Sequence, residues 1–311
     1  MLSWQEFAEY AKELKISSEY VEQNREFFNK IDPDYFDKLL GLQELPEREI
    51  ETAYPDGEYR RLIFILLVAK YPQMKKIYQE RGYSMLHFEE VKQDISLWLD
   101  KSMADTKGKI AGIDFRLYNW ESMIFAGETL QFGRLQCNRR HKFESKVGCF
   151  VNSAGEIEIR KVDGNCKDAL FSFDDEAINI HIPASGKLLR EDCLKSLKMM
   201  KEFFEQQAVD YKAVVCYSWI LDPVFAEITP KSNLIEFQKL GHLYRMDGHD
   251  QTDEVAWRVF DIPEANIAEI EKIPCRSSMQ KAVAAYLRNG GKFCEYGMII
   301  LRSELETLLK N

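Results

Sequence analysis

The hydrophobic period of the chain changes near Gly127, and this change constrains the fold more than any other feature. Before it, apolar residues recur every three or four positions, as Phe7 and Ala11 do, which is the spacing of amphipathic helices. After it, apolar and polar residues alternate, as they do on half-buried strands. The sequence therefore predicts two domains, a helical one over residues 1–126 and a strand-containing one over residues 127–311.

Local patterns place individual helices in the first domain. Asp32 followed by Pro33 is a helix cap and a first-turn proline, so a short helix is expected to run from there to about Gly41. Residues 58–70 are apolar on all sides of a helix, which is typical of the buried centre of a bundle. An apolar stripe over residues 88–98 predicts one further helix.

The second domain is expected to begin with antiparallel strands and to continue through a strand–helix–strand crossover. The pattern predicts a hairpin over 147–159, a strand over 178–182, a helix over 189–204, a strand buried on both faces over 213–221, a helix from Ser277, and a strand over 293–301. A crossover makes the strands that it joins parallel. The fold class is therefore α+β with a mixed sheet.

The charge of the chain limits its partners. With 42 Lys and Arg against 51 Asp and Glu, the formal net charge is −9, whereas a nucleic-acid-binding protein carries a basic surface. No nucleic-acid partner is therefore expected, although a local basic pocket for a small anion stays open.

The number and spacing of the cysteines predict a protein of a reducing compartment. Seven cysteines without a C-x-x-C pair argue against a disulfide framework or a zinc ribbon. No metal-ligand spacing is present, so no metal site is expected. The longest apolar run, residues 62–69, is far shorter than the roughly 20 residues of a membrane span, and the acidic N-terminus is unlike a signal peptide. A cytoplasmic protein without membrane contact is the prediction.

Five separated motifs in the second domain carry a family resemblance. They are FGRLQ (132–136), IHIPASGKL (180–188), YSWILDP (217–223), SNLIEFQ (232–238) and RSSMQKA (276–282). In this order they resemble a bacterial family of two-domain acyltransferases, in which a helical N-terminal domain precedes a GNAT-like C-terminal domain. The resemblance implies a GNAT-like fold over 127–311 and an acyl-CoA co-substrate, such as acetyl-CoA.

The resemblance also implies where the cofactor binds. In such folds the loop after the pre-crossover strand cradles the pyrophosphate with backbone N–H groups at a helix N-terminus. Here the cofactor-binding residues would be Ile182, Ala184, Ser185, Gly186 and Lys187. The usual Q/R-x-x-G-x-G/A loop is absent, and two carboxylates follow in the first helical turn, so an ordinary strand-to-helix turn is the alternative.

Acyl transfer to an amine needs proton transfer and an acceptor site, and five residues are candidates. His181 is the candidate general base, and either Ser218 or Tyr217 is the candidate proton donor to the leaving thiolate. Arg134 and Asp222 are candidates for substrate binding. The alternatives are structural: a packed histidine, a polar residue in a buried strand, a solvated strand face, and a helix cap at Asp222.

The expected activity is N-acyl transfer, of an acetyl or other short acyl group, from acyl-CoA to the amine of a small molecule or peptide. Direct transfer in a ternary complex is favoured, because nothing near Cys216 in the sequence supplies a base for a covalent route. Two alternatives remain: a GNAT-like module that senses acyl-CoA without turnover, and a protein-interaction scaffold. The acceptor, the acyl length and the oligomeric state are not indicated by the sequence.

Overall fold

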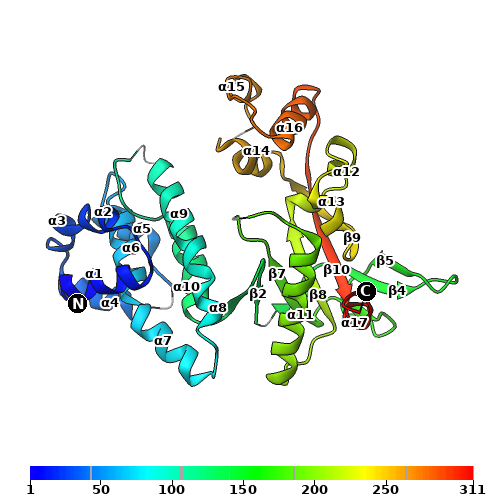
Figure 1. Ribbon diagram of the computed structural model, residues 1–311, viewed down its shortest axis with the longest axis horizontal. Coiled ribbons are helices and arrows are strands. Elements are labelled where there is room, and N and C mark those ends of the chain that lie inside the picture. The colour runs from blue at the N-terminus through cyan, green and yellow to red at the C-terminus, as the bar shows by residue number, and fades with distance from the viewer. Residues whose placement is uncertain (43, 106–107, 140, 185, 263–264, 311) are drawn as a thin grey trace. The chain divides into compact units, whose positions relative to one another are not determined.

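The computed structural model describes residues 1–42, 44–105, 108–139, 141–184, 186–262 and 265–310. The chain forms two compact units. One comprises Met1–Gln131 with Pro183–Ser185, and the other comprises Phe132–Ile182 with Gly186–Asn311. Figure 1 shows helices alone in the blue and cyan part of the chain before the first strand, and strands mixed with helices in the green to red part.

The first unit is built around one apolar helix. Its helices are α1 (Trp4–Glu13), α2 (Ser18–Glu22), α3 (Arg25–Phe28), α4 (Pro33–Leu40), α5 (Glu47–Ala53), α6 (Tyr59–Ala69), α7 (Tyr71–Glu80), α8 (Leu86–Glu89), α9 (Val91–Asp105) and α10 (Phe115–Phe125). All side chains from Leu62 to Val68 of α6 are buried, so the predicted bundle centre is confirmed. The predicted cap is also confirmed, since the Asp32 carboxylate accepts the Tyr35 N–H at the start of α4.

One helix boundary in this unit differs from the sequence-based expectation. The apolar stripe over residues 88–98 belongs to two helices, α8 and α9, which meet at Glu90. The prediction of a single helix there is wrong. Side-chain spacing reports which face of a helix is buried, and two successive helices that bury the same face leave that spacing intact.

The chain contains a seven-stranded mixed sheet. Its strands follow the order β1 (Thr129–Phe132), β2 (Leu135–Asn138), β7 (Glu176–His181), β8 (Ala213–Ser218), β10 (Cys294–Leu301) and β9 (His242–Asp250), with β3 (His141–Lys142) also paired to β7. Only β7 and β8 are described as parallel, and α11 (Arg190–Gln206) joins them. The predicted crossover is therefore confirmed, and the fold class is α+β with a helical N-terminal half.

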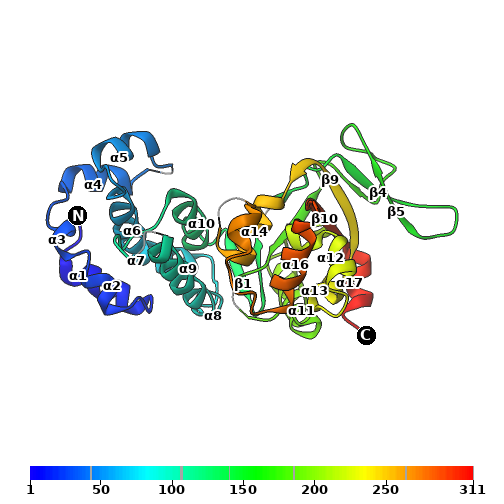
Figure 2. The same ribbon diagram turned by 90° about the horizontal axis from the view of Figure 1, so that it is seen from above.

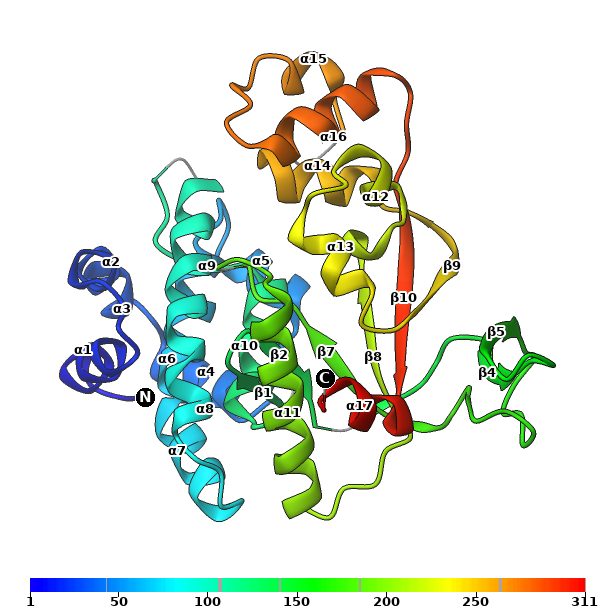
Figure 3. The same cartoon turned by 45° about the vertical axis from the view of Figure 1, so that its right-hand side comes forward.

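The two faces of this sheet are covered differently, as Figures 1, 2 and 3 show. On one face lies α11, whose Cys193 neighbours Cys216 of β8. On the other face lies the second sheet, of order β5 (Ile157–Lys161), β4 (Val147–Val151) and β6 (Phe171–Ser172), which is the predicted hairpin with one more strand. The apolar core between the main sheet and the second sheet includes Phe143 and Phe171.

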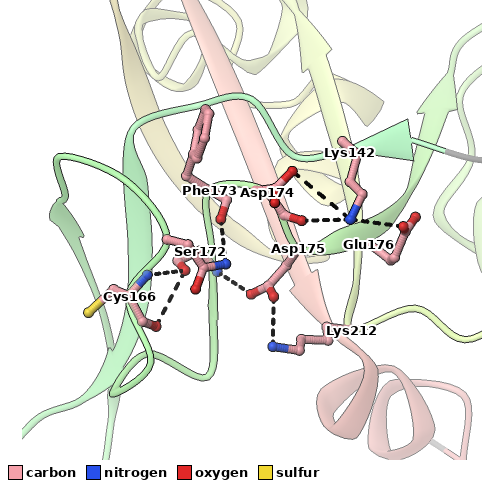
Figure 4. Close-up of polar contacts among 9 residues, drawn as sticks. Lys142, Cys166, Ser172, Phe173, Asp174, Asp175, Glu176 and Lys212 are labelled. Atoms are coloured by element: carbon pink, nitrogen blue, oxygen red, sulfur yellow. Dashed lines mark hydrogen bonds and ion pairs between the residues drawn. The ribbon is translucent and has the colours of Figure 1, made fainter.

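A polar turn joins the second sheet to the main one (Figure 4). Asp174 occupies the left-handed region with φ 68°, and Asp175 binds the Lys212 ammonium at 2.7 Å. Lys142 lies 3.0 Å from the Glu176 carboxylate and donates to the Asp174 carbonyl. The contacts of Lys142 and Lys212 join the residues at the start of β7 to β3 and to the residue before β8, so they hold the start of β7 in place.

Most of the remaining helices pack at the end of the sheet where β8 stops and β10 begins, and the last of them, which follows β10, lies at the opposite end. They are the 3₁₀ helix η1 (Trp219–Leu221), α12 (Val224–Ile228), α13 (Asn233–Gln238), α14 (Thr252–Phe260), α15 (Ile267–Ile270), α16 (Ser278–Arg288) and α17 (Arg302–Leu308). The predicted strand over 213–221 is wrong at its end, because β8 stops at Ser218 and η1 follows. The predicted helix from Ser277 is confirmed, with a complete capping box between Ser277 and Gln280. Within the described part of the chain, no helix is long and apolar enough to cross a membrane.

Gly297 of β10 provides a test of the packing between the sheets. A Cβ at this position would lie 2.2 Å from the Tyr244 ring, which is buried in the shared core. We expect Gly297→Ala to lower the free energy of unfolding by about 1–3 kcal/mol in urea denaturation. Gly164→Ala is the matched control, because a Cβ at Gly164 meets nothing within 4 Å. Equal stability of the two variants would contradict this packing.

Candidate functional site

The main sheet opens between its two parallel strands. The pairing of β7 with β8 runs from Ala177–Ala213 to Ile180–Cys216 and ends there. Beyond that point β8 stays with β10, through Tyr217–Gly297 and Ser218–Tyr296. His181 stays with Gln136 of β2. The two strands therefore part while each keeps its outer neighbour, and backbone groups on the facing edges are left to bind a ligand.

Anchors beyond β8 hold this opening. The buried Asp222 carboxylate accepts the Val224 N–H at 3.0 Å and the Cys294 N–H of β10 at 2.7 Å. The Gln238 side chain donates to the carbonyls of Ile220 and Asp222. Both carboxylate oxygens of Asp222 therefore accept hydrogen bonds from backbone N–H groups. The predicted contact of Asp222 with an acceptor amine stays a prediction.

The loop that follows β7 presents unpaired backbone donors. No side chain caps α11, and within the described ranges none of the backbone N–H groups from Lys187 to Asp192 donates to a protein acceptor. Gly186 is exposed with φ +77°, and a Cβ there would meet nothing within 4 Å. Helix N-termini with free N–H groups favour anions. Glu191 and Asp192 are exposed.

The predicted cofactor residues belong to the segment of the chain between β7 and α11. Ile182 directly follows β7 and is partly buried, whereas Ala184 and Lys187 are exposed. Ser185 lies outside the described residues. The Arg134 side chain, from the turn between β1 and β2, donates to the Lys187 carbonyl at 2.9 Å. The guanidinium of Arg134 therefore contacts the loop. The predicted contact of Arg134 with a substrate stays a prediction.

His181 stands at the edge of the opening in a polar group of its own. Its Nε2 lies 2.6 Å from Asn138 Oδ1, which also accepts from Asn179 Nδ2 at 3.2 Å. Asn179 Nδ2 also lies 3.4 Å from Nε2, but the much shorter contact is to an amide oxygen, which can only accept, so we assign the hydrogen to Nε2 and the lone pair to Nδ1. Burial, with a smaller effect of nearby His141, lowers the pKa of His181 to about 4. The imidazole is therefore neutral at physiological pH.

The two candidate proton donors lie on opposite faces of β8. Tyr217 packs on the face toward the second sheet, with its hydroxyl 3.4 Å from His141 Nε2, and burial raises its pKa to about 12. Alternation places Ser218 on the α11 face, with Cys216. Ser218 Oγ accepts the Ile220 N–H at 3.5 Å and keeps its own hydrogen to donate. Tyr217 therefore shares a face with His181, and Ser218 does not.

The described residues contain no group of three or more His, Cys, Asp or Glu side chains arranged to hold a metal ion. The arrangement around the opening offers backbone donors, neutral imidazole and hydroxyl groups instead.

Comparison with known proteins identifies the family. The family model described as the GNAT-like C-terminal domain matches residues 129–299, which is more than half of the chain. The chain belongs to the GNAT-like C-terminal domain family. The region of the GNAT-like match includes the opening, the loop and all the candidate site residues. Comparison with curated protein sequences finds no match.

Solved structures share the fold of this GNAT-like chain. An acyltransferase mutant in complex with octanoyl-CoA has a TM-score of 0.68 and 18% sequence identity, with 96% of this chain and 88% of the other covered. An acyltransferase in complex with decanoyl-CoA and teicoplanin has a TM-score of 0.67 and 18% identity, with 94% and 86% covered. The fold implied by the five motifs is thus confirmed, and it is a fold found in acyltransferases that bind acyl-CoA.

Sequence reasoning about the GNAT-like domain did not find Asn138 or His141 as members of the site. Asn179 could be found, since strand alternation puts it on the same face as His181. The others come from β2 and β3, and only the register of these strands with β7 brings them close.

The lowered pKa of His181 predicts a pH dependence of stability. Between its ordinary value of 6.5 and about 4, the unfolded chain binds a proton that the folded chain does not. This histidine should therefore lower the free energy of unfolding as the pH falls through that window, by up to about 3 kcal/mol. His181→Asn should lose this dependence in urea denaturation at pH 7.5 and 5.

His242→Asn is the control of opposite sign. The Glu304 carboxylate raises the pKa of His242, so its stabilisation is full at low pH and is lost as the pH rises through the raised value. An identical pH dependence in wild type and His181→Asn would contradict the neutral, buried state of His181.

A second prediction concerns the anchor at Asp222. An asparagine keeps the shape but places an N–H₂ group against one of two backbone donors, so Asp222→Asn should cost about 1–3 kcal/mol of unfolding free energy. Asp247→Asn removes the same charge from an exposed ion pair with Lys161 and should leave the stability close to that of the wild type. Thermal melts of both variants test this, and a stable Asp222→Asn protein would remove the anchoring role.

Proposed function

We propose that this chain is an acyl-CoA-dependent N-acyltransferase that transfers the acyl group directly to an amine in a ternary complex. The observation that carries the proposal is the parting of β7 from β8 beside the uncapped N-terminus of α11. The unpaired edges of β7 and β8 would bind an extended chain with amide groups, and the free N–H groups before and in the first turn of α11 would bind an anion. Coenzyme A has both features, in its pantetheine arm and its pyrophosphate.

The binding of each part follows from these groups. The pantetheine arm would lie in the opening and hydrogen-bond to the free strand edges, as an added strand does. The pyrophosphate would accept from the N–H groups after Gly186, with the Lys187 ammonium adding positive charge. The thioester would then lie near His181, where β7 ends.

The chemistry needs one proton removed and one supplied. The amine nitrogen attacks the thioester carbon, a C–N bond forms, and the attacked nitrogen becomes acidic as it gains positive charge. His181 is neutral, so its Nδ1 takes that proton even though its pKa is low. When the C–S bond breaks, the thiolate of coenzyme A takes a proton from Ser218 or Tyr217, both of which are protonated at neutral pH.

We propose a small molecule with an amine as the acceptor. Support comes from the acyltransferase in complex with decanoyl-CoA and teicoplanin, which shares the fold. The acyl group should be screened from acetyl to decanoyl, because octanoyl and decanoyl thioesters occur in the structures of similar fold.

The first experiment is a thermal melt with CoA and acyl-CoA, and with ATP and NAD as controls. Ligand at about 100 times its Kd should add roughly 2.7 kcal/mol to the free energy of unfolding, which is several degrees in Tm. Release of free thiol in the presence of amines then measures turnover. Binding without thiol release for any amine would support a sensor in place of an enzyme, and no CoA-selective shift would overturn the proposal.

Variants assign the proton-transfer roles. His181→Ala should lower turnover by about 10²–10⁴-fold, whereas His242→Ala should leave turnover unchanged, since His242 binds Glu304 away from the opening. Ser218→Ala and Tyr217→Phe each remove one hydroxyl, and the one that slows thiol release identifies the proton donor. Full activity of His181→Ala would exclude this residue as the base.

A further inference from the structure

We infer that Arg134 is the positioning residue that orients the loop before α11, and that it makes the site selective for thioesters of whole coenzyme A over thioesters of pantetheine. This inference rests on the proposed function. Arg134 lies in the turn between β1 and β2, outside the loop. It would therefore affect the bound pyrophosphate only by orienting the loop.

The contacts of Arg134 fall on two consecutive peptide groups. Its Nε donates to the Lys187 carbonyl oxygen at 2.9 Å, and its Nη2 lies 3.5 Å from the Gly186 carbonyl oxygen. A guanidinium presents several N–H donors in one fixed plane, so it can hold two neighbouring oxygens on one side of the chain. A lysine ammonium has no such planar arrangement.

Because Arg134 holds the carbonyl oxygens of the loop, the geometry of the peptide group also determines where the following N–H groups point. In a planar trans peptide the C=O and the following N–H point in opposite directions. Drawing the carbonyls of Gly186 and Lys187 toward Arg134 therefore turns the N–H groups of Lys187 and Leu188 away from it. Neither N–H donates to an acceptor in the part of the chain that the structure describes. Successive N–H groups on one side of a loop form an anion-binding concavity.

The backbone of Arg134 is hydrogen-bonded to α11, the helix that follows the loop. Its N–H donates to Ser196 Oγ at 2.9 Å, and that hydroxyl donates to the Asp192 carbonyl at 2.9 Å. Neighbouring Gly133 has φ +60°, and a Cβ there would lie 3.3 Å from Ser196 Oγ. The turn between β1 and β2 thus packs closely on α11, so the guanidinium reaches the loop from a fixed base.

This arrangement predicts which substrates should depend on Arg134. An acyl-CoA carries the pyrophosphate and gains from oriented N–H groups, whereas an acyl-pantetheine ends before the phosphates and gains nothing from them. A variant that releases the loop should therefore be slow with acyl-CoA at low concentration and unchanged with acyl-pantetheine.

The experiment compares Arg134→Met and Arg134→Lys with Arg160→Met in the full chain. Arg160 is an arginine of β5 with an exposed partner, Glu158, so its variant is the matched control for loss of one positive charge. We expect Arg134→Met to raise the KM for acyl-CoA and the Kd for CoA by about 10-fold or more, with kcat little changed. Arg134→Lys should recover only part of this loss. The kcat/KM for acyl-pantetheine should stay at the wild-type value.

The outcomes separate this inference from the proposed function. Equal losses on both thioesters would mean that Arg134 supports the fold or the acceptor, and no loss on either would mean that the loop is oriented without it. In both cases the inference fails while CoA binding by the wild type still supports the proposed function. If the wild type itself does not bind CoA in calorimetry, the proposed function fails first and this inference fails with it.

Discussion

The parting of β7 from β8 is the constraint on which the rest of the site depends. Strands in a sheet normally pair along their whole length, because each unpaired N–H or C=O that leaves water loses a hydrogen bond. Here each strand keeps its outer neighbour, β2 for β7 and β10 for β8, and only the inner pairing ends. Beyond Ile180 and Cys216 the inner edges of β7 and β8 are therefore not paired with each other, and under the proposed function a ligand with amide groups would hydrogen-bond there.

The gap persists because the chain after β8 is held from the other side. The Asp222 carboxylate binds the Cys294 N–H of β10, and Gln238 of α13 holds the carbonyls on either side of Leu221. The hydrogen bond to the Asp222 carboxylate is charge-assisted and therefore stronger than a hydrogen bond between neutral groups. Asp222, which sequence reasoning placed in substrate binding, thus fixes the backbone after β8, and its contact with a substrate stays a prediction.

The sequence predicts the elements of this fold better than it predicts their contacts. Period and turn residues are local properties, so the buried helix α6, the hairpin of β4 and β5, and the crossover through α11 could all be predicted from spacing alone. The end of β8 could not, because residues 219–221 are as apolar as the strand before them, and a hydroxyl at Ser218 starts the 3₁₀ turn.

The candidate site shows the same division between local and distant information. The loop from Ile182 to Lys187 follows a strand and precedes a helix, so its place could be predicted. The ties of Arg134 to that loop and of Asn138 to His181 join residues more than 40 positions apart. Strand register creates these pairs, and no spacing within the sequence encodes them.

Under the proposed function, two sets of groups near the opening would act on different parts of the acyl-CoA thioester. At the helix end, free N–H groups and a positive side chain suit charge that is already present on the ligand. At the strand end, burial keeps His181 neutral and Asn138 fixes its hydrogen on Nε2, so Nδ1 can accept a proton only when the reaction produces one. In the proposed enzyme, binding and proton transfer would thus depend on separate groups at the two ends of the loop between β7 and α11. Because the groups are separate, the affinity of the loop for the ligand can change without changing the protonation state of the histidine.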